Sequence, residues 1–389
     1  MLAKRADLPL IAKTYSGKQV MLLVRISFPD AVYGVPETEI PRKHDSINVF
    51  YRSLSRNTFE FDFRIHPEIL MAPKTQAYFS EGNEAHKGEL LEWIKTRVKE
   101  LSLVPGKDYD KFLANFPGTS ARTWGLSDGE DGIANYVGGS YDASVAAHEL
   151  GHTVGLPHAR SIEAGTDIWD SPGARNFVIE YGDPFSVMGH PYGWEHFHVD
   201  AKWKVGWMDK EEVIEVKTSG VYRLHAHDNP VHKGRLLGVR VPTSNTYLAY
   251  WLEYRNTNST AGKGASVMME GYMGPSASAT GTYLLDMSPG GQTVNDSVDA
   301  TLEPGKEFTD RFGGTVYRTL GIQSGSGNEP GWVEVRITLP GGIRIVSPEK
   351  RGPWEFAAGF TGLRIDALGR TPGAAGKQGT RIGYRGTIR

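Results

Sequence analysis

The chain has 389 residues, a formal net charge of −2 with histidine neutral, and no cysteine. A near-neutral chain has no broad positive electrostatic potential that would attract nucleic acid or an acidic membrane. A chain without cysteine has no disulfide framework, thiol nucleophile or cysteine-bound metal. The length predicts two or three domains, and no run of about 18 apolar residues predicts a membrane span.

The first half alternates strand and helix patterns. Gln19–Phe28 is an almost continuous apolar run, as in a buried central strand, and Thr58–Ile65 alternates as a second strand would. Between them, Asp45 could cap a helix over Ser46–Leu54, while Glu84–Leu101 has the spacing of an amphipathic helix. Such alternation is typical of a layered α/β (α+β) domain. Shorter strand patterns follow near Phe112–Phe116, Arg122–Leu126 and Gly132–Gly139.

From about Lys210 the pattern changes to short strands separated by Gly, Pro, Asn and Ser. That spacing predicts an antiparallel β-sandwich. We therefore expect an α/β domain over residues 1–208, a β-sandwich domain over 209–341, and a Gly/Arg-rich tail or linker over 342–389. The strand candidates of the second domain are Val213–Val216, Val221–His225, Leu236–Val241, Tyr247–Tyr254, Gly281–Asp286, Thr315–Thr319 and Trp332–Leu339.

The stretch AAHELGHTVGLPHA carries the clearest chemistry. His148 and His152 are four apart, so a helix places both imidazoles on one face, where they can share one metal ion. Glu149 lies beside that face, where its carboxylate could take a proton from a metal-bound water. Gly155 allows the turn that ends the helix, so His158 arrives from a new direction. Three neutral nitrogens and one water make a catalytic type of zinc site, with a merely histidine-rich helix as the alternative.

HELGHTVGLPH resembles the extended HExxHxxGxxH signature of the metzincin metalloproteases, which also carry a methionine in a tight turn beneath the zinc. YGDPFSVMGHPYG is similar to that turn. The local sequence most resembles the gametolysin-type peptidases and, more distantly, the immune-inhibitor-type peptidases. KWKVGWM and YWLEYR are further similar pieces. The resemblance implies a catalytic domain with a twisted mixed sheet and a zinc-site helix. It also implies zinc ligation by His148, His152 and His158, Glu149 as general base and proton shuttle, and Met188 as the hydrophobic floor.

The residue that stabilises the oxyanion departs from the family pattern. Some metzincins place a tyrosine two residues after the methionine, whereas this chain has His190 there and Tyr192 four residues after it. We expect His190 or Tyr192 to fill the role, with packing or surface exposure as the alternative. The resemblance also implies an edge strand that pairs with an extended substrate, and Arg122–Leu126 or Ile133–Val137 is the candidate.

One Zn²⁺ ion is the expected cofactor, and Ca²⁺ is a second candidate. Asn295–Asp299 (NDSVD) offers oxygen ligands, as do Asp128, Glu130 and Asp131. Neither stretch has an ordered ligand pattern, so polar turns explain both.

We expect a zinc endopeptidase that hydrolyses peptide bonds in proteins or glycoproteins. The alternative is a catalytically weak metzincin-like module that binds glycans or proteins through the β-sandwich, although the intact Glu149 favours the enzyme. A protease whose sandwich reads a glycan beside the scissile bond is a third interpretation. The start of the chain lacks an apolar run long enough for a signal peptide. We expect a secreted or extracellular protein, with a cytoplasmic one as the alternative.

Overall fold

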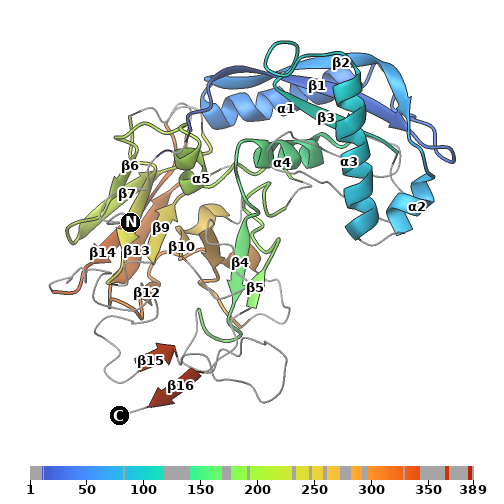
Figure 1. Cartoon of the computed structure of the whole chain (residues 1–389). Coiled ribbons are helices and arrows are strands. Elements are labelled where there is room, and N and C mark those ends of the chain that lie inside the picture. Colours follow the sequence, from blue (N-terminus) through green and yellow to red (C-terminus); the bar gives the residue numbers. More distant parts are fainter. Residues whose placement is uncertain are drawn as a thin grey trace, which may run out of the picture.

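The structure is a computed structural model. It describes residues 11, 13–81, 84–117, 141–168, 177–190, 193–229, 234–244, 248–256, 261–271, 282–290, 297–326, 329–341, 364–367 and 384–387. Over these ranges the chain has a mixed α/β fold with several sheets and few helices (Figure 1). No helix within them is long and apolar enough to cross a bilayer.

A three-stranded parallel sheet forms the centre of the N-terminal part. β1 (Gly17–Ser27) lies between β2 (Phe59–Met71) and β3 (Lys111–Asn115). Successive residues of β1 point to opposite faces, so its apolar run contributes to two cores. Met21 belongs to one core and Leu22 to the other, and both side chains are buried. The two strands expected near Gln19 and Thr58 are therefore present, with β1 central as its apolar run predicts.

Helices cover both faces of this sheet: α1 (Ile40–Ser55), α2 (Gln76–Glu81), α3 (Glu84–Glu100) and α4 (Ala143–Thr153). α1 and α4 lie side by side on one face (Figure 1), where the buried Tyr51 hydroxyl donates to the Ala147 carbonyl oxygen at 2.8 Å. Side chains of α3 pack on the other face. The helix expected from Ser46 begins earlier, at Ile40, so Asp45 is no cap. Pro41 lies in its first turn, where a residue without an N–H costs no hydrogen bond.

The rest of the chain forms two larger sheets. One of them, with seven strands, has mixed pairing that differs from the antiparallel arrangement expected, because β6 pairs with β8 and β4 with β11 in parallel. The seven-stranded sheet has the order β5 (Phe177–Ile179), β4 (Arg160–Glu163), β11 (Thr282–Leu285), β10 (Ser266–Glu270), β9 (Ala249–Glu253), β8 (Gly238–Pro242), β6 (Val213–Glu215). The four-stranded sheet has the order β12 (Glu307–Thr309), β13 (Val316–Gln323), β14 (Trp332–Thr338), β7 (Gly220–His225), all antiparallel.

Strands from both halves of the sequence share the seven-stranded sheet. β4 and β5 precede residue 208, yet β4 hydrogen-bonds to β11. A parallel pair needs a long crossover, which the chain between β4 and β11 provides. The boundary near residue 208 remains a prediction, but the segment that follows His158 is tied to the C-terminal half.

Both faces of the seven-stranded sheet are covered. One face shares an apolar core with the four-stranded sheet, including Tyr250 and Val335. The other face packs against α5 (Val199–Lys204) and the side chain of Phe185. In the predicted tail, two short strands pair, β15 (Arg364–Ala367) with β16 (Tyr384–Thr387).

His44 on α1 makes the fold sensitive to acid. Its ring stacks on Phe63 at 3.9 Å between centroids and is almost fully buried, and burial lowers the pKa of His44 to about 3. The unfolded chain protonates this ring near pH 6.5, but the folded protein does not. Between pH 6.5 and about 3 the unfolded state therefore binds the extra proton, and stability falls as pH falls. We expect the pH dependence of the free energy of unfolding to be shallower in His44→Phe than in the wild type, by about 1.4 kcal/mol per pH unit.

Urea unfolding of the metal-free protein between pH 6.5 and 4 measures this effect. His66→Phe, on β2, is the matched control, and we expect its stability profile to parallel that of the wild type. A His44→Phe profile as steep as the wild-type one would contradict the assignment.

Candidate metal and active site

Helix α4 presents the first two histidines of the motif. Its N-terminus is capped by Asp142, whose carboxylate accepts from the backbone N–H groups of Ser144 at 2.9 Å and Val145 at 3.3 Å. The helix ends at Thr153, and Gly155 has a φ of 86°, a left-handed conformation that favours glycine. His158 consequently lies on a separate segment, directly before β4.

The three histidines converge. His148, His152 and His158 each offer one nitrogen, and these ligand atoms all lie within 4.8 Å of one another. The ring centroids are 4.9 Å apart for His148 and His152, 5.2 Å for His148 and His158, and 4.7 Å for His152 and His158. They are the one such group of metal-binding side chains among the residues described in the structure.

Each ring is held through its Nδ1 atom. His148 Nδ1 is 2.8 Å from the Val187 carbonyl oxygen, and His152 Nδ1 is 2.7 Å from that of Leu156. His158 Nδ1 is 2.7 Å from Glu180 Oε1. These oxygens can only accept, so Nδ1 carries the proton and the lone pair of each ring is on Nε2. All three rings are therefore fixed in the tautomer that binds a metal through Nε2.

Burial keeps these ligands neutral. It lowers the pKa of His148 to about 3 and that of His152 to about 4, and it also lowers the pKa of His158. A neutral imidazole is the form that binds metal, so these side chains need lose no proton at neutral pH. Three neutral nitrogens with no thiolate match the ligand set of a catalytic zinc site. The residues present therefore fit Zn²⁺.

Glu149 is buried beside the first ligand. Burial raises the pKa of its carboxyl to about 8. A carboxylate with a pKa near the working pH can both accept and return a proton, which is what a general base needs. A bound cation nearby would lower this pKa and favour the ionised form.

The methionine turn, residues 183–189, packs directly against α4. The Met188 carbonyl oxygen accepts from the Ala159 N–H at 3.1 Å, next to His158. A Cβ atom on Gly151 would collide with Sδ of the buried Met188, so the glycine between the two helical histidines allows this close approach. The turn thus contacts the chain between His148 and His152 and again directly after His158.

Two residues at the site were not expected from the sequence. Glu180 accepts from His158 and also pairs with Arg160 at 2.7 Å, and Arg160 lowers the pKa of Glu180 to about 2. The Tyr181 hydroxyl lies 3.0 Å from His158 Nε2, and its ring is half-exposed. Burial raises the pKa of Tyr181 to about 12, with a further contribution from Glu149, so the phenol keeps its proton. Both residues follow β5, and spacing alone could not show that β5 pairs with the strand after His158.

The remaining expected site residues are placed differently. The exposed His190 directly follows the methionine turn, and its N–H donates to the Ser186 carbonyl oxygen at 2.8 Å. Tyr192 lies outside the described residues, as do both candidate substrate strands and the candidate calcium ligands at 128–131. Of Asn295–Asp299, residues 297–299 form a short 3-10 helix. The roles assigned to His190, Tyr192 and calcium remain predictions.

Comparisons with known proteins leave the family open. No protein-family model matches the chain, and no curated protein matches its sequence. Two crystal forms of wild-type OgpA from Akkermansia muciniphila are weakly similar in structure. One has 15% identity over 41% of this chain and 53% of that chain at a TM-score of 0.25. The other has 11% identity over 81% and 92% at a TM-score of 0.32. The chain thus spans about half the length of OgpA in the first alignment. Scores this low carry no argument, so the chemistry rests on the residues of the site.

Proposed function

We propose that this protein is a zinc-dependent endopeptidase of the metzincin type. The observation that carries the proposal is the convergence of His148, His152 and His158 beside the buried Glu149, with each ring held at Nδ1 so that its lone pair is on Nε2. A structural histidine cluster would not need three neutral rings whose ligand nitrogens all lie within 4.8 Å of one another. The methionine turn beneath α4 supports the same interpretation.

The chain's own residues supply the proton chemistry. When bound, zinc supplies Lewis-acid activation of a water molecule and of the scissile carbonyl. Glu149 then accepts the proton of the attacking water and returns it to the nitrogen of the leaving amine. Glu180 holds the His158 ring, and the Val187 carbonyl oxygen holds the His148 ring, so neither can rotate during turnover.

Tyr181 is placed to act on the substrate carbonyl. Its hydroxyl uses the lone pair of His158 Nε2, the same lone pair that a metal ion requires. Metal binding therefore frees the hydroxyl to donate to the oxyanion that forms as water attacks. We expect Tyr181→Phe to lower kcat about a hundredfold with little change in KM, measured on a quenched fluorescent peptide.

Parallel His190→Ala and Tyr192→Phe variants compare this role with the candidates from the sequence. A tetrahedral phosphinate peptide should bind Tyr181→Phe more weakly than wild type, while zinc content stays at one ion per chain. A tenfold loss in either parallel variant, without a loss in Tyr181→Phe, would move the role to that residue.

The activity itself is tested on a broad peptide library with mass-spectrometric readout. We expect internal peptide bonds to be cut, cleavage to stop when a chelator removes the metal, and cleavage to return when zinc is restored. Zinc-bound protein that cuts no peptide would favour the binding module instead. Comparing glycosylated with bare substrates decides whether a glycan contributes to recognition.

A further inference from the structure

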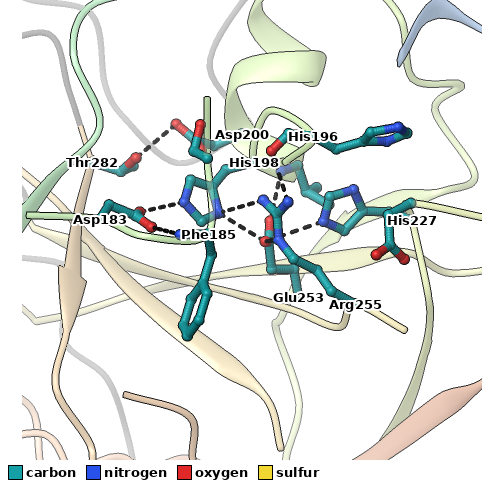
Figure 2. Close-up of polar contacts among 12 residues, drawn as sticks. Asp183, Phe185, His196, His198, Asp200, His227, Glu253, Arg255 and Thr282 are labelled. Atoms are coloured by element: carbon teal, nitrogen blue, oxygen red, sulfur yellow. Dashed lines mark hydrogen bonds and ion pairs between the residues drawn. The ribbon is translucent and has the colours of Figure 1, made fainter. Parts of the chain in front are cut away.

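A chain of buried charged side chains joins the methionine turn to the seven-stranded sheet (Figure 2). Glu253, at the end of β9, has a fully buried carboxylate. Its Oε1 atom is 2.7 Å from His198 Nδ1, and the other ring nitrogen of His198 pairs with the Asp183 carboxylate. Two carboxylates from distant parts of the chain thus share one imidazole.

The protonation state of His198 determines how its ring connects the two carboxylates. Both of its ring nitrogens lie within hydrogen-bonding distance of carboxylate oxygens, which favours the doubly protonated imidazolium, and Arg255 Nη2 also lies 3.1 Å from Nδ1. Burial alone would lower the pKa of His198, but Asp183 and Glu253 outweigh it and raise the pKa to about 10. An imidazolium between two carboxylates fixes the spacing and angle of both.

The Asp183 end of the chain holds the methionine turn. Asp183 is 1% exposed, and its Oδ1 atom accepts from the Phe185 N–H at 2.8 Å. Four and five residues after Asp183, the turn supplies the Val187 carbonyl oxygen to the His148 ring and the Met188 carbonyl oxygen to the Ala159 N–H. A shift of Asp183 would therefore move the Val187 carbonyl oxygen, which orients the His148 ring. It would also move the Met188 carbonyl oxygen, which holds the segment that carries His158.

The Glu253 end is anchored by further contacts. Glu253 Oε2 accepts from the Val199 N–H at 2.7 Å, which fixes the start of α5, and Arg255 pairs with Oε1 at 2.8 Å. His227 lies 3.1 Å from the same oxygen, and Lys202 Nζ is 3.0 Å from His227 Nδ1. Figure 2 shows Glu253 close to His198, Arg255 and His227. The negative charge of Glu253 is thus balanced by Arg255, and His198 connects the Glu253 carboxylate to the methionine turn through Asp183.

We propose that Glu253 is a positioning residue for the three-histidine metal site, acting through His198 and Asp183 on the methionine turn. The C-terminal half of the chain is then a working part of the site rather than a separable binding module. The inference rests on the proposed metal site but not on peptidase activity.

The test compares two buried glutamates on adjacent strands of one sheet. Glu253→Gln keeps shape and removes the charge that holds His198. Glu270→Gln, on β10, makes the same change to a buried carboxylate that pairs with Arg240 and Trp251. Zinc affinity is measured by competition with a chromophoric chelator, at a temperature where circular dichroism shows every variant folded.

We expect Glu253→Gln to weaken zinc binding at least tenfold and Glu270→Gln to stay within threefold of wild type. In the metal-free protein, hydrogen exchange of residues 141–160 should be faster in Glu253→Gln only. Asp183→Asn tests the same link from the other end and decides the matter if Glu253→Gln does not fold. The double variant should lose no more zinc affinity than the stronger single one.

Equal zinc affinity in wild type, Glu253→Gln and Asp183→Asn would overturn the proposal, as would equal losses in Glu253→Gln and Glu270→Gln. The zinc measurement needs no substrate. Failure of the positioning role is therefore distinct from failure of the peptidase function, which shows as zinc-bound protein that cuts no peptide.

Discussion

Glu149→Gln should lower kcat roughly a thousandfold while the protein keeps one zinc ion and its fold. Glutamine has nearly the shape of glutamate but cannot accept the proton of the attacking water at neutral pH. The side chain is buried, so bulk buffer cannot easily take over the transfer. The loss should therefore lie in kcat, with KM almost unchanged.

Glu163→Gln, on β4, is the matched control for charge and for substitution type, and it should keep wild-type turnover. Both variants are assayed on one internally quenched peptide, with zinc measured by atomic emission on the same samples. Hydrolysis by Glu149→Gln within tenfold of wild type would remove Glu149 from the chemistry and the proposed mechanism with it.

His152→Ala should weaken zinc binding at least a hundredfold and abolish activity at ordinary zinc concentrations. In structural zinc sites, where four protein ligands share a binding free energy of about 10–16 kcal/mol, each ligand accounts for roughly 3 kcal/mol, and we expect a similar contribution from His152. The His152 ring is fixed before metal binding by the Leu156 carbonyl oxygen, so its loss also removes a preorganised ligand. Because zinc binds only the folded state, the variant should also lose the increase in melting temperature that zinc gives the wild type.

His66→Ala provides the control, because His66 lies on β2 outside the three-histidine group. Chelator competition and thermal melts with and without zinc are run on both variants. Wild-type affinity in His152→Ala would show that the ion, if bound, is held elsewhere.

The three-histidine group could be predicted because it is local in sequence. His148 and His152 are one helical turn apart, and Gly155 marks the turn before His158, so three of the residues that matter fall within eleven positions. The cap of this helix is equally local, because Asp142 accepts from the N–H of Ser144 only two residues later. Propensity and periodicity act over such short distances and leave readable patterns.

Glu180 and Tyr181 could not be predicted, because their position depends on strand pairing. They reach His158 only because β5 pairs antiparallel with β4, and β4 in turn pairs with β11, more than a hundred residues later. The sequence pattern does not specify which strands become neighbours. Parallel pairing of β4 with β11 also could not be predicted, because no strand was expected at Arg160–Glu163 and β11 was expected in an antiparallel sandwich.

The buried chain of Asp183, His198 and Glu253 was hidden for a related reason. Each residue has an ordinary neighbourhood in the sequence, and a buried charge is recognisable only once its partner is known. The sequence predicts that Glu253 lies in a different domain from the three histidines. In the structure, the His198 imidazole connects Glu253 to Asp183 and so to the turn that holds His148.

The central claim is that three imidazoles hold one zinc ion beside Glu149. An anomalous difference map tests it most directly, from crystals of the zinc-loaded protein measured just above and just below the zinc absorption edge. We predict one strong peak, present only above the edge, about 2.0–2.1 Å from Nε2 of His148, His152 and His158. An anomalous peak elsewhere, or rings that point apart with no peak between them, would contradict this account of the site.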